Sequence, residues 1–310
     1  MVIKPCTKAE VDFYQTCAAR NEPLLPYMPR FMGTLQLSTP EQKQALEEQK
    51  PPLDGTAASL SLTDPGPLKG KKLETERAIV LENAAAGFVK PNIMDLKLGA
   101  RLWDDAAPPA KRQRLDDVAK KTTSGSLGFR VAGMRVWNAE KQEFKAYDKM
   151  YGRQFNEETV IQAFEEYFGL RARGRKDSSD LQGVLHVVKK EIDAVRAALE
   201  VMELRMYSAS ILIVYEGDEE TLRKTLDAHT QAVDRETAKE DEGDYGEVRN
   251  VLVEVVLMIS IDTDDADEQS PFCKVVMIDF AHATFVSGQG RDENVLRGVD
   301  SVLDILENMN

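Results

Sequence analysis

The sequence predicts an α+β protein with two lobes, and three observations lead to that class. The chain has 310 residues, of which 42% are hydrophobic and 30% charged, as in an ordinary globular protein with a sizeable core. Strand-like and helix-like segments are mixed without the regular strand–helix–strand repeat of a parallel sheet. Residues 181–206 carry one apolar stripe in steps of four and three, which is typical of a helix packed on a core.

The first half of the chain predicts short elements around one long insert. The expected elements are a helix at 8–20, strands at 31–37, 77–81 and 93–99, a loop at 104–110, a basic helix at 111–121 and a strand at 126–137. Pro108 and Pro109 stand directly before the basic helix. Residues 38–70 are rich in Pro, Gly, Ser, Thr and Gln, which predicts an insert with one helix near 40–50.

The second half predicts two long helices and three buried strands. Asn156 is suited to cap a helix at 156–168. The stripe in 181–206 favours a core-facing helix over a coiled-coil dimer; its residues are Leu181, Leu185, Val188, Ile192, Val195, Leu199 and Met202. Short runs rich in Val and Ile predict strands at 210–215, 251–261 and 274–278, and an amphipathic helix is expected at 293–307. The acidic segments 217–250 and 262–271 predict partly mobile inserts.

Charge and composition exclude several classes of protein. The net charge is −13, and residues 216–268, with 18 acidic and 5 basic residues, account for all of it. Residues 111–135 carry 7 basic and 2 acidic residues, so a local anion-binding surface is compatible with an acidic chain. Direct nucleic-acid binding is not expected. No apolar run is long enough for a transmembrane segment. Three scattered cysteines and three scattered histidines argue against a disulfide scaffold and a His-based metal site.

The segment Pro91–Gly99 reads PNIMDLKLG and places two charges on one face of a strand. Side chains alternate along a strand, so Met94, Leu96 and Leu98 point to the core while Asp95 and Lys97 point the other way. A carboxylate and an ammonium side by side can hold a hydroxyl and a phosphate together. From the spacing alone, a surface ion pair is the alternative reading.

Two further segments end or begin a buried strand with a polar residue. Residues 275–282 read VVMIDFAH, and Asp279 after four apolar residues is suited to present a Mg²⁺ ligand or to cap the next turn. Residues 207–217 read YSASILIVYEG, in which Ser210 opens an apolar run. By itself this third segment also reads as a plain core strand.

Taken together, these segments resemble the inositol polyphosphate kinase family, and within it the fungal-type multikinases. The family's PxxxDxKxG signature is matched by Pro91, Asp95, Lys97 and Gly99. Its Ser-Leu-Leu-type strand is matched at 210–212 and its Ile-Asp-Phe motif at 278–280, followed by Ala281 and His282. Residues 122–137, 151–153 and 295–305 are also similar to the family. The resemblance covers nearly the whole chain and is looser at 38–70 and 217–270.

The resemblance implies a two-lobed fold, distantly similar to protein kinases, with ATP between the lobes. The N-lobe would span 1–82 with the insert at 38–70, and the C-lobe 83–310 with an inositol-binding helix at about 108–122. Lys4 matches the N-lobe lysine that contacts ATP phosphates, and Glu10 pairs with it by analogy with kinases. Glu82 and Ala84 match the hinge that reads adenine through backbone groups. Relatives carry two strands and a turn before this lysine, so we expect a phosphate-covering hairpin to be missing here.

The resemblance also assigns the reacting groups, with ATP and Mg²⁺ as cofactors. Asp95 would orient the acceptor hydroxyl, as a possible base, or the nucleotide ribose. Lys97 would bridge the γ-phosphate and the inositol phosphate substrate. Asp279 would hold Mg²⁺, supported by Ser210.

The substrate is expected to bind basic side chains. On the helix at 111–121 the resemblance favours Lys120, with Arg114 and Lys121 as further candidates, and it places His282 next to a substrate phosphate. A solvated helix face is the alternative for Arg112, Arg114 and Lys121. On this same helix stand Asp116 and Asp117, which would repel phosphates unless they turn away.

The expected activity is phosphorylation of inositol 1,4,5-trisphosphate to the tetrakis- and pentakisphosphates, with phosphoinositide lipid as a further possible substrate. Alternatives are an inositol trisphosphate 3-kinase, an inositol hexakisphosphate kinase, or a non-catalytic nuclear scaffold that binds transcription factors through its acidic segments. The proline-flanked basic run at 108–116 resembles a nuclear import signal, so location in nucleus and cytoplasm is expected.

Overall fold

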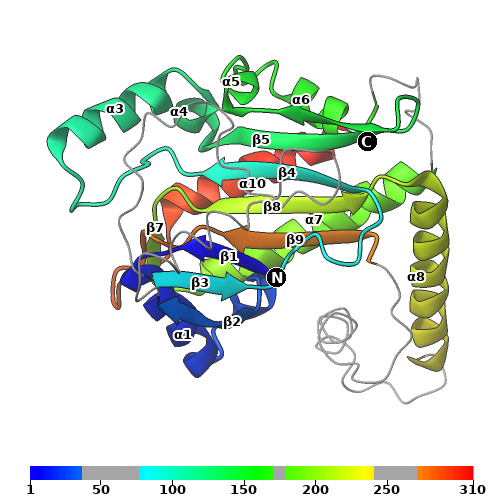
Figure 1. The fold of residues 1–310 in the computed structure, drawn as a ribbon, viewed down its shortest axis with the longest axis horizontal. Helices are drawn as coiled ribbons and strands as arrows, with labels where there is room; N and C mark the ends of the chain where they lie inside the picture. Colours follow the sequence, from blue (N-terminus) through cyan, green and yellow to red (C-terminus); the bar gives the residue numbers. More distant parts are fainter. Residues whose placement is uncertain (37–76, 171–178, 241–270, 310) are drawn as a thin grey trace.

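The computed structural model describes residues 1–36, 77–170, 179–240 and 271–309 of the chain. The expected insert at 38–70 with its helix, the strand at 251–261 and nearly all of the segment 262–271 lie outside the described residues. The described elements form two larger antiparallel sheets, one of three strands and one of five, together with a two-stranded pair and the helices around them (Figure 1).

The smaller sheet contains the N-terminal residues. Its strands are β1 (Val2–Pro5), β3 (Arg77–Leu81) and β2 (Phe31–Gln36), in that order across the sheet. The helix α1 (Lys8–Arg20) follows β1, and a short 3-10 turn, η1 (Leu25–Tyr27), precedes β2. Thr7 caps α1 by accepting from the backbone N–H of Glu10. Phe13 of α1 stacks on Phe280 with ring centroids 4.8 Å apart, so α1 joins the small sheet to the rest of the molecule.

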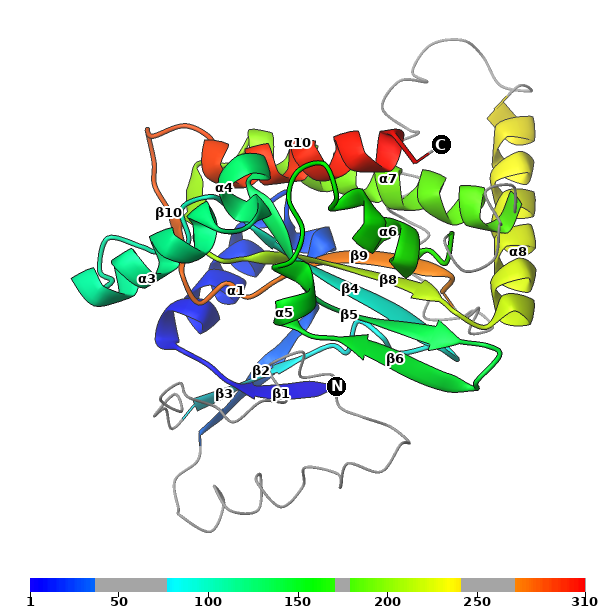
Figure 2. The same cartoon turned by 90° about the horizontal axis from the view of Figure 1, so that it is seen from above.

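The larger sheet is five-stranded and has β4 at its centre. Its order is β6 (Glu143–Tyr147), β5 (Phe129–Asn138), β4 (Pro91–Leu98), β8 (Ser210–Glu216) and β9 (Cys273–Ile278), and all neighbours are antiparallel. Met94, Leu96 and Leu98 are buried, as the alternation predicted. The helices α7 (Ser179–Glu200) and α10 (Glu293–Glu307) lie together over one face of this sheet (Figure 2).

The remaining described elements connect or flank this sheet. They are α3 (Pro109–Lys120), α4 (Thr123–Leu127), α5 (Lys149–Gly152), α6 (Ile161–Tyr167), β7 (Leu204–Met206), α8 (Glu219–Glu240) and β10 (Ala283–Phe285). Helix α8 stands at the far end of the sheet in both views (Figures 1 and 2). No described helix is long and apolar enough to span a bilayer.

The expected helix at 181–206 is correct in its stripe and wrong in its end. All seven stripe residues are buried, but α7 ends at Glu200 and residues 204–206 form β7, paired with β10. Leu204 and Met206 are two residues apart and both buried, a spacing that suits a strand. The backbone N–H of Met206 also donates to Asp292 at 2.7 Å.

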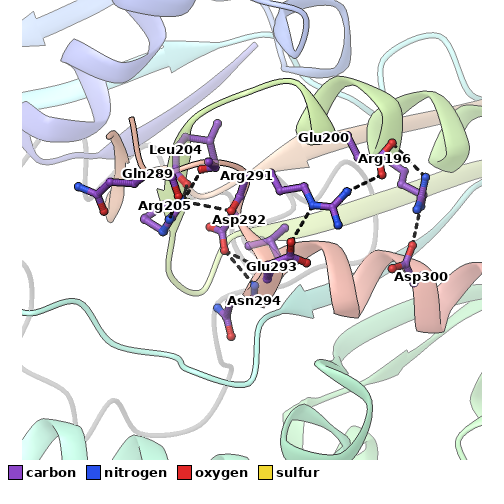
Figure 3. Close-up of polar contacts among 12 residues, drawn as sticks. Arg196, Glu200, Leu204, Arg205, Gln289, Arg291, Asp292, Glu293, Asn294 and Asp300 are labelled. Carbon is purple, nitrogen blue, oxygen red and sulfur yellow. Dashed lines mark hydrogen bonds and ion pairs between the residues drawn. The ribbon is translucent and has the colours of Figure 1, made fainter. Parts of the chain in front are cut away.

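A polar network holds the segment from the end of α7 to β7 against the start of α10 (Figure 3). Asp292 caps α10 by accepting from the N–H groups of Asn294 and Val295. Burial raises the pKa of Asp292 above its ordinary value. Arg205 donates to the carbonyl groups of residues 289–291, and Arg291 pairs with Glu200 at 3.0 Å. The C-terminal helix is thereby fixed to the end of α7.

Three other expected elements needed correction. The strand expected at 126–137 begins at Phe129, because residues 123–127 form α4, which Gly128 ends with a φ of 70°. The helix expected at 156–168 begins at Ile161, since the Asn156 side chain caps a preceding turn instead. The acidic segment expected to be a partly mobile insert contains α8, whose first turn Asp218 caps through Thr221.

Candidate active site

The sheet register brings the expected reacting groups into one row. Lys97 on β4 is paired with Ser210 on β8, and Ser210 is paired with Ile278 on β9. Asp279 follows directly, with a φ of 69°, a left-handed conformation that is rare for a residue with a side chain. Such a strained residue persists only where its surroundings hold it.

Lysines from both sheets hold the Asp279 carboxylate. Lys4 Nζ on β1 lies 2.9 Å from Oδ1, and Lys97 Nζ lies 3.5 Å from Oδ2. Burial opposes ionisation, but Lys97 and Lys4 together keep the pKa of Asp279 below its ordinary value. The Asp279 side chain is still 44% exposed, so the carboxylate is accessible from outside.

Lys4 has a second carboxylate partner on α1. Its Nζ lies 2.8 Å from Oε1 of Glu10, whose side chain is almost fully buried. Burial lowers the pKa of Lys4, but Asp279 and Glu10 outweigh it and raise the pKa above its ordinary value. The ammonium is therefore charged at neutral pH and fixed between the two sheets.

Asp95 is the buried carboxylate of the large sheet at this site. It is 7% exposed, and it lies next to the buried hydroxyl of Ser210, which acts as a hydrogen-bond donor to it. Burial raises the pKa of Asp95 above its ordinary value; Lys97 and the Ser210 hydroxyl oppose this rise, and Asp279 adds to it. Lys97 itself donates to the carbonyl of Ser208 at 2.8 Å, which aims its ammonium between the carboxylates.

The expected hinge segment is anchored at both ends by carboxylates. Glu82 forms an ion pair with Lys274 of β9 and accepts from the backbone N–H of Arg30 at 3.3 Å. Ala84 is buried. Further along, the buried Glu216 accepts from the backbone N–H groups of residues 89 and 90 at 2.7 and 2.8 Å. The chain between the two sheets is thus held in one conformation.

The basic helix is α3, which begins at Pro109, earlier than expected. Arg114, Lys120 and Lys121 are exposed. Within the described part of the chain, no hydrogen bond or ion pair joins these three side chains to Asp95, Lys97 or Asp279.

The acidic residues of α3 and the histidine after Asp279 have partners of their own. Asp116 accepts from the Trp103 indole N–H at 2.6 Å, and Asp117 accepts from Gln113 at 3.0 Å. Both carboxylates therefore have neutral local donors as partners. His282 contacts Asp104 through Nδ1. Asp104 lies in the loop before α3, so this contact ties the loop to the segment that carries Asp279.

Comparison with known proteins places the chain in a family. The family model described as "Inositol polyphosphate kinase" matches residues 78–307. The chain belongs to the inositol polyphosphate kinase family. As a member of it, the protein is an inositol phosphate kinase, and the family and enzyme class expected from the sequence are confirmed.

Similar proteins are named as multikinases. The inositol polyphosphate multikinase of Saccharomyces cerevisiae is 31% identical over 98% of this chain and 91% of its own length. That of Schizosaccharomyces pombe is 33% identical over 70% of this chain and 72% of its own length. A crystal structure of the inositol phosphate multikinase of S. cerevisiae, in complex with ADP and Mn²⁺, superposes with a TM-score of 0.64 at 27% identity, covering 99% of this chain and 98% of that one. The expected α+β kinase-family fold is confirmed.

Sequence reasoning missed several residues around this kinase site. Asp104 and Glu216 were not singled out, nor were Arg130 and Arg153, although both arginines lie in segments that carried the resemblance. Their partners are distant in sequence: Glu216 binds backbone groups 126 and 127 positions away. For the arginines a signal existed, since Arg130 belongs to the basic segment 111–135 and Arg153 to the family-like segment 151–153.

The side chains of the kinase site supply only some of the ligands that a divalent cation needs. The described residues contain no group of three or more His, Cys, Asp or Glu side chains arranged to hold a metal ion. Asp279 is accessible, and Ser210 on β8 is the register partner of Ile278, the residue before Asp279. A cation that takes one or two carboxylates and completes its shell with phosphate oxygens and water suits this donor set.

Proposed function

We propose that this kinase is an ATP-dependent inositol polyphosphate multikinase, which converts inositol 1,4,5-trisphosphate to tetrakis- and pentakisphosphates. One observation carries the proposal: Lys4 and Lys97 converge on Asp279 from two sheets, beside the buried Asp95. Two cations and two carboxylates at one point are what transfer between two polyanions requires. Support for the multikinase type comes from the names of the yeast relatives.

In the proposed reaction, an acceptor hydroxyl oxygen forms a bond to the γ-phosphorus as the bond to the ADP oxygen breaks. Asp95 accepts the hydrogen bond of that hydroxyl and its proton, because burial raises the pKa of its carboxylate and so favours uptake of a proton. Lys97 contacts the transferred phosphoryl group and an inositol phosphate oxygen. Holding the reactants in line and offsetting charge supply most of the rate enhancement in such reactions.

The nucleotide would lie between the two sheets, where Lys4 contacts its phosphates. Backbone groups of Glu82 and Ala84 would contact the adenine, because the side chain of Glu82 is already occupied by Lys274. Bound nucleotide phosphates would compete with Asp279 for Lys4. The ion pair with Glu10 keeps that ammonium in place during the exchange.

Asp279 would hold Mg²⁺, with the Ser210 hydroxyl supporting the site from β8. When bound, the cation neutralises charge on the nucleotide phosphates. The S. cerevisiae relative was crystallised with ADP and Mn²⁺, which supports the use of a divalent cation with the nucleotide. Asp279 is the accessible carboxylate of the pair, and Asp95 stays free for the acceptor.

The inositol phosphate would bind on the side of α3. Lys120, Arg114 and Lys121 are exposed there and can contact ring phosphates, and His282 is three residues from Asp279. A ring that carries several phosphates needs several charged donors rather than one apolar pocket. The pairing of Asp104 with His282 fixes the ring of that histidine for such a contact.

Phosphoinositide kinase activity belongs to the same proposal, since a phosphatidylinositol bisphosphate headgroup carries the same ring phosphates. Its test is transfer from labelled ATP to lipid vesicles that contain the bisphosphate, compared with vesicles that lack it. Incorporation that requires both the lipid and Lys97 supports this activity, and none contradicts it.

Nuclear and cytoplasmic location, with transcription-factor partners for the acidic segments, is the last part of the proposal. The basic run at 108–116 supports nuclear entry and overlaps α3. A fluorescent fusion with Lys111 replaced by Ala would leave the nucleus if this run acts as an import signal. A kinase-dead Asp95→Asn chain that still supports every cellular role would favour the scaffold reading.

The decisive experiment is a Mg·ATP assay with inositol 1,4,5-trisphosphate that resolves products by position. Wild type should form tetrakis- and pentakisphosphate, and Lys97→Ala should lose at least about 100-fold in kcat, the usual cost of removing a charge-stabilising donor. Lys8→Ala, an exposed lysine of α1, is the matched control and should keep full activity. A wild-type chain without Lys97-dependent turnover would refute the proposal.

A further inference from the structure

Two arginines lie across β4 from Asp279. Arg130 on β5 is the register partner of Lys97, so both side chains leave the same face of the sheet. Asp279 follows β9, which is separated from β4 by β8 on the other side. Asp95 and Lys97 therefore stand between Arg130 on one side and the Lys4–Asp279 pair on the other.

Gly152 allows the second arginine, Arg153, to lie close to Arg130. Gly152 ends α5, and a Cβ there would lie 1.9 Å from the carbonyl oxygen of Val131 on β5. Only glycine allows this approach, so α5 lies directly on the strand next to Arg130. Arg153 follows Gly152 and is close enough to affect Arg130. Burial and the charge of Arg153 lower the pKa of Arg130 to about 10, which leaves it protonated at neutral pH.

Neither guanidinium has a carboxylate within ion-pair distance in the described part of the chain. Arg130 donates to the hydroxyl of Ser124 at 2.9 Å, which fixes its orientation from α4. Arg153 has a buried Nε without a hydrogen-bond partner. Arg130 is attracted by Asp95 and repelled by Arg153, and an anion bound between the two arginines would offset that repulsion.

We propose that Arg130 and Arg153 together bind one phosphate of the acceptor, next to the hydroxyl that Asp95 receives. This inference rests on the proposed function and names a part of the substrate site that Lys120, Arg114, Lys121 and His282 do not cover. A guanidinium presents a planar fork of donors that matches phosphate oxygens, so two of them can hold one phosphate with four hydrogen bonds. The nucleotide is excluded as occupant because its phosphates meet Lys4 on the other side of β4.

The position of α3 agrees with an acceptor on this side. Helix α4 follows α3, and a Cβ at Gly125 would lie 2.6 Å from the carbonyl of Ala119, so the two helices are packed without a gap. Ser124 of α4 then orients Arg130. The basic helix and the arginine pair thus belong to one connected unit along β5.

The test compares wild type with Arg130→Met, Arg153→Gln and the double variant. KM for inositol 1,4,5-trisphosphate should rise about 10- to 100-fold in each single variant, the usual effect of losing a hydrogen bond to a charged group. The double variant should lose less than the product of the two, because both arginines hold one phosphate. KM for ATP should change less than about twofold. Lys141→Gln, an exposed lysine in the β5–β6 turn, is the matched control.

Competing inositol bisphosphates, each lacking one ring phosphate, separate binding from a structural role. The analogue without the phosphate that the pair holds should inhibit wild type and variants with equal Ki. The other analogues should lose affinity in the variants as the trisphosphate does. Equal losses with every analogue, or an unchanged KM for the trisphosphate, would overturn the proposal.

Two further measurements distinguish a loss of phosphate binding from a loss of folding or of charge. Thermal midpoints identify a variant that fails to fold, and Arg130→Lys and Arg153→Lys keep the charge without the planar fork; they should show a smaller rise in KM. If wild type itself does not phosphorylate inositol phosphates, the proposed function fails and this inference falls with it. Wild-type turnover with arginine-independent KM refutes the arginine subsite alone.

Discussion

The ammonium of Lys4 lies 2.9 Å from Oδ1 of Asp279, although 275 positions separate them in the sequence. This contact joins the small sheet to the end of β9 in the large sheet. Asp279 holds a left-handed backbone conformation there, and Lys97 contacts its other oxygen at 3.5 Å. A strained residue held between two lysines is a pre-organised site, since the charges are in position before any ligand binds.

Replacing Lys4 with Met should lower kcat about 10²- to 10³-fold, because one preformed cation at the transferring phosphates is lost. KM for ATP should rise as well, whereas KM for the inositol phosphate should stay within about twofold because its site lies across β4. Initial-rate kinetics with each substrate varied separately measure this. Lys8→Met is the control, and an unchanged kcat in Lys4→Met would remove Lys4 from the nucleotide site.

The contact between Asp104 and His282 predicts that a change at Asp104 affects KM for the inositol phosphate but not KM for ATP. Asp104→Asn keeps the shape of the side chain but replaces the carboxylate that contacts the His282 ring through Nδ1. KM for the inositol phosphate should rise about three- to tenfold and KM for ATP should not change, as expected for a partly exposed charge contact. Asp105→Asn, at the exposed neighbour, is the control. Equal effects of both changes would indicate that Asp104 acts only on the loop.

Local patterns in the sequence predicted much of the fold. Strand 77–81 and helix 293–307 have the expected bounds, since each shows its own apolar periodicity. Strand β1 was missed because its four residues carry no run of apolar side chains, and it exists only through pairing with β3. The end of α7 was misplaced because Leu204 and Met206 continue an apolar pattern that both a helix and a strand accept.

The site residues could be predicted from the sequence where the pattern within a single strand indicates them. Asp95 and Lys97 follow from alternation along β4, and Asp279 from its position after an apolar run. The contact of Lys4 with Asp279 depends on how the sheets pack, and no local pattern encodes it. The arginine pair depends on the approach of Gly152 to Val131, which is a tertiary contact.

The close approach of Gly152 to Val131 predicts a large effect from adding one methyl group at position 152. Gly152→Ala forces α5 away from β5, because the added Cβ would lie 1.9 Å from a backbone oxygen. We expect a loss of about 1–3 kcal/mol in the free energy of unfolding, as for other overpacked sites, and a rise in KM for the inositol phosphate as Arg153 moves. Urea unfolding and kinetics measure the two effects.

The matched control for this change is Gly183→Ala in the interior of α7. Its Cβ would meet only the end of the flexible Leu226 side chain at 3.2 Å. Alanine is favoured over glycine in a helix by up to about 1 kcal/mol, so this variant should be as stable as wild type or more so. A Gly152→Ala chain as stable as that control would show that α5 is free to move.

The ion pair between Glu82 and Lys274 predicts a pH-dependent contribution to stability. Burial raises the pKa of Glu82, but Lys274 and the N–H of Arg30 outweigh it and hold the pKa below its ordinary value of 4.5. Because the folded pKa is below the unfolded pKa, the stabilisation is fully present above pH 4.5 and is lost as the pH falls through the folded pKa. Acid therefore removes it.

Lys274→Met should accordingly cost about 0.5–1 kcal/mol of unfolding free energy at pH 7, the range for a partly exposed pair. The difference from wild type should shrink steadily below pH 4.5 as Glu82 becomes protonated in both chains. Urea denaturation at a series of pH values measures it, with Lys224→Met, from an exposed pair within α8, as the control. A difference that stays constant down to pH 3, or grows, would mean that Lys274 stabilises the chain by packing and not through the charge of Glu82.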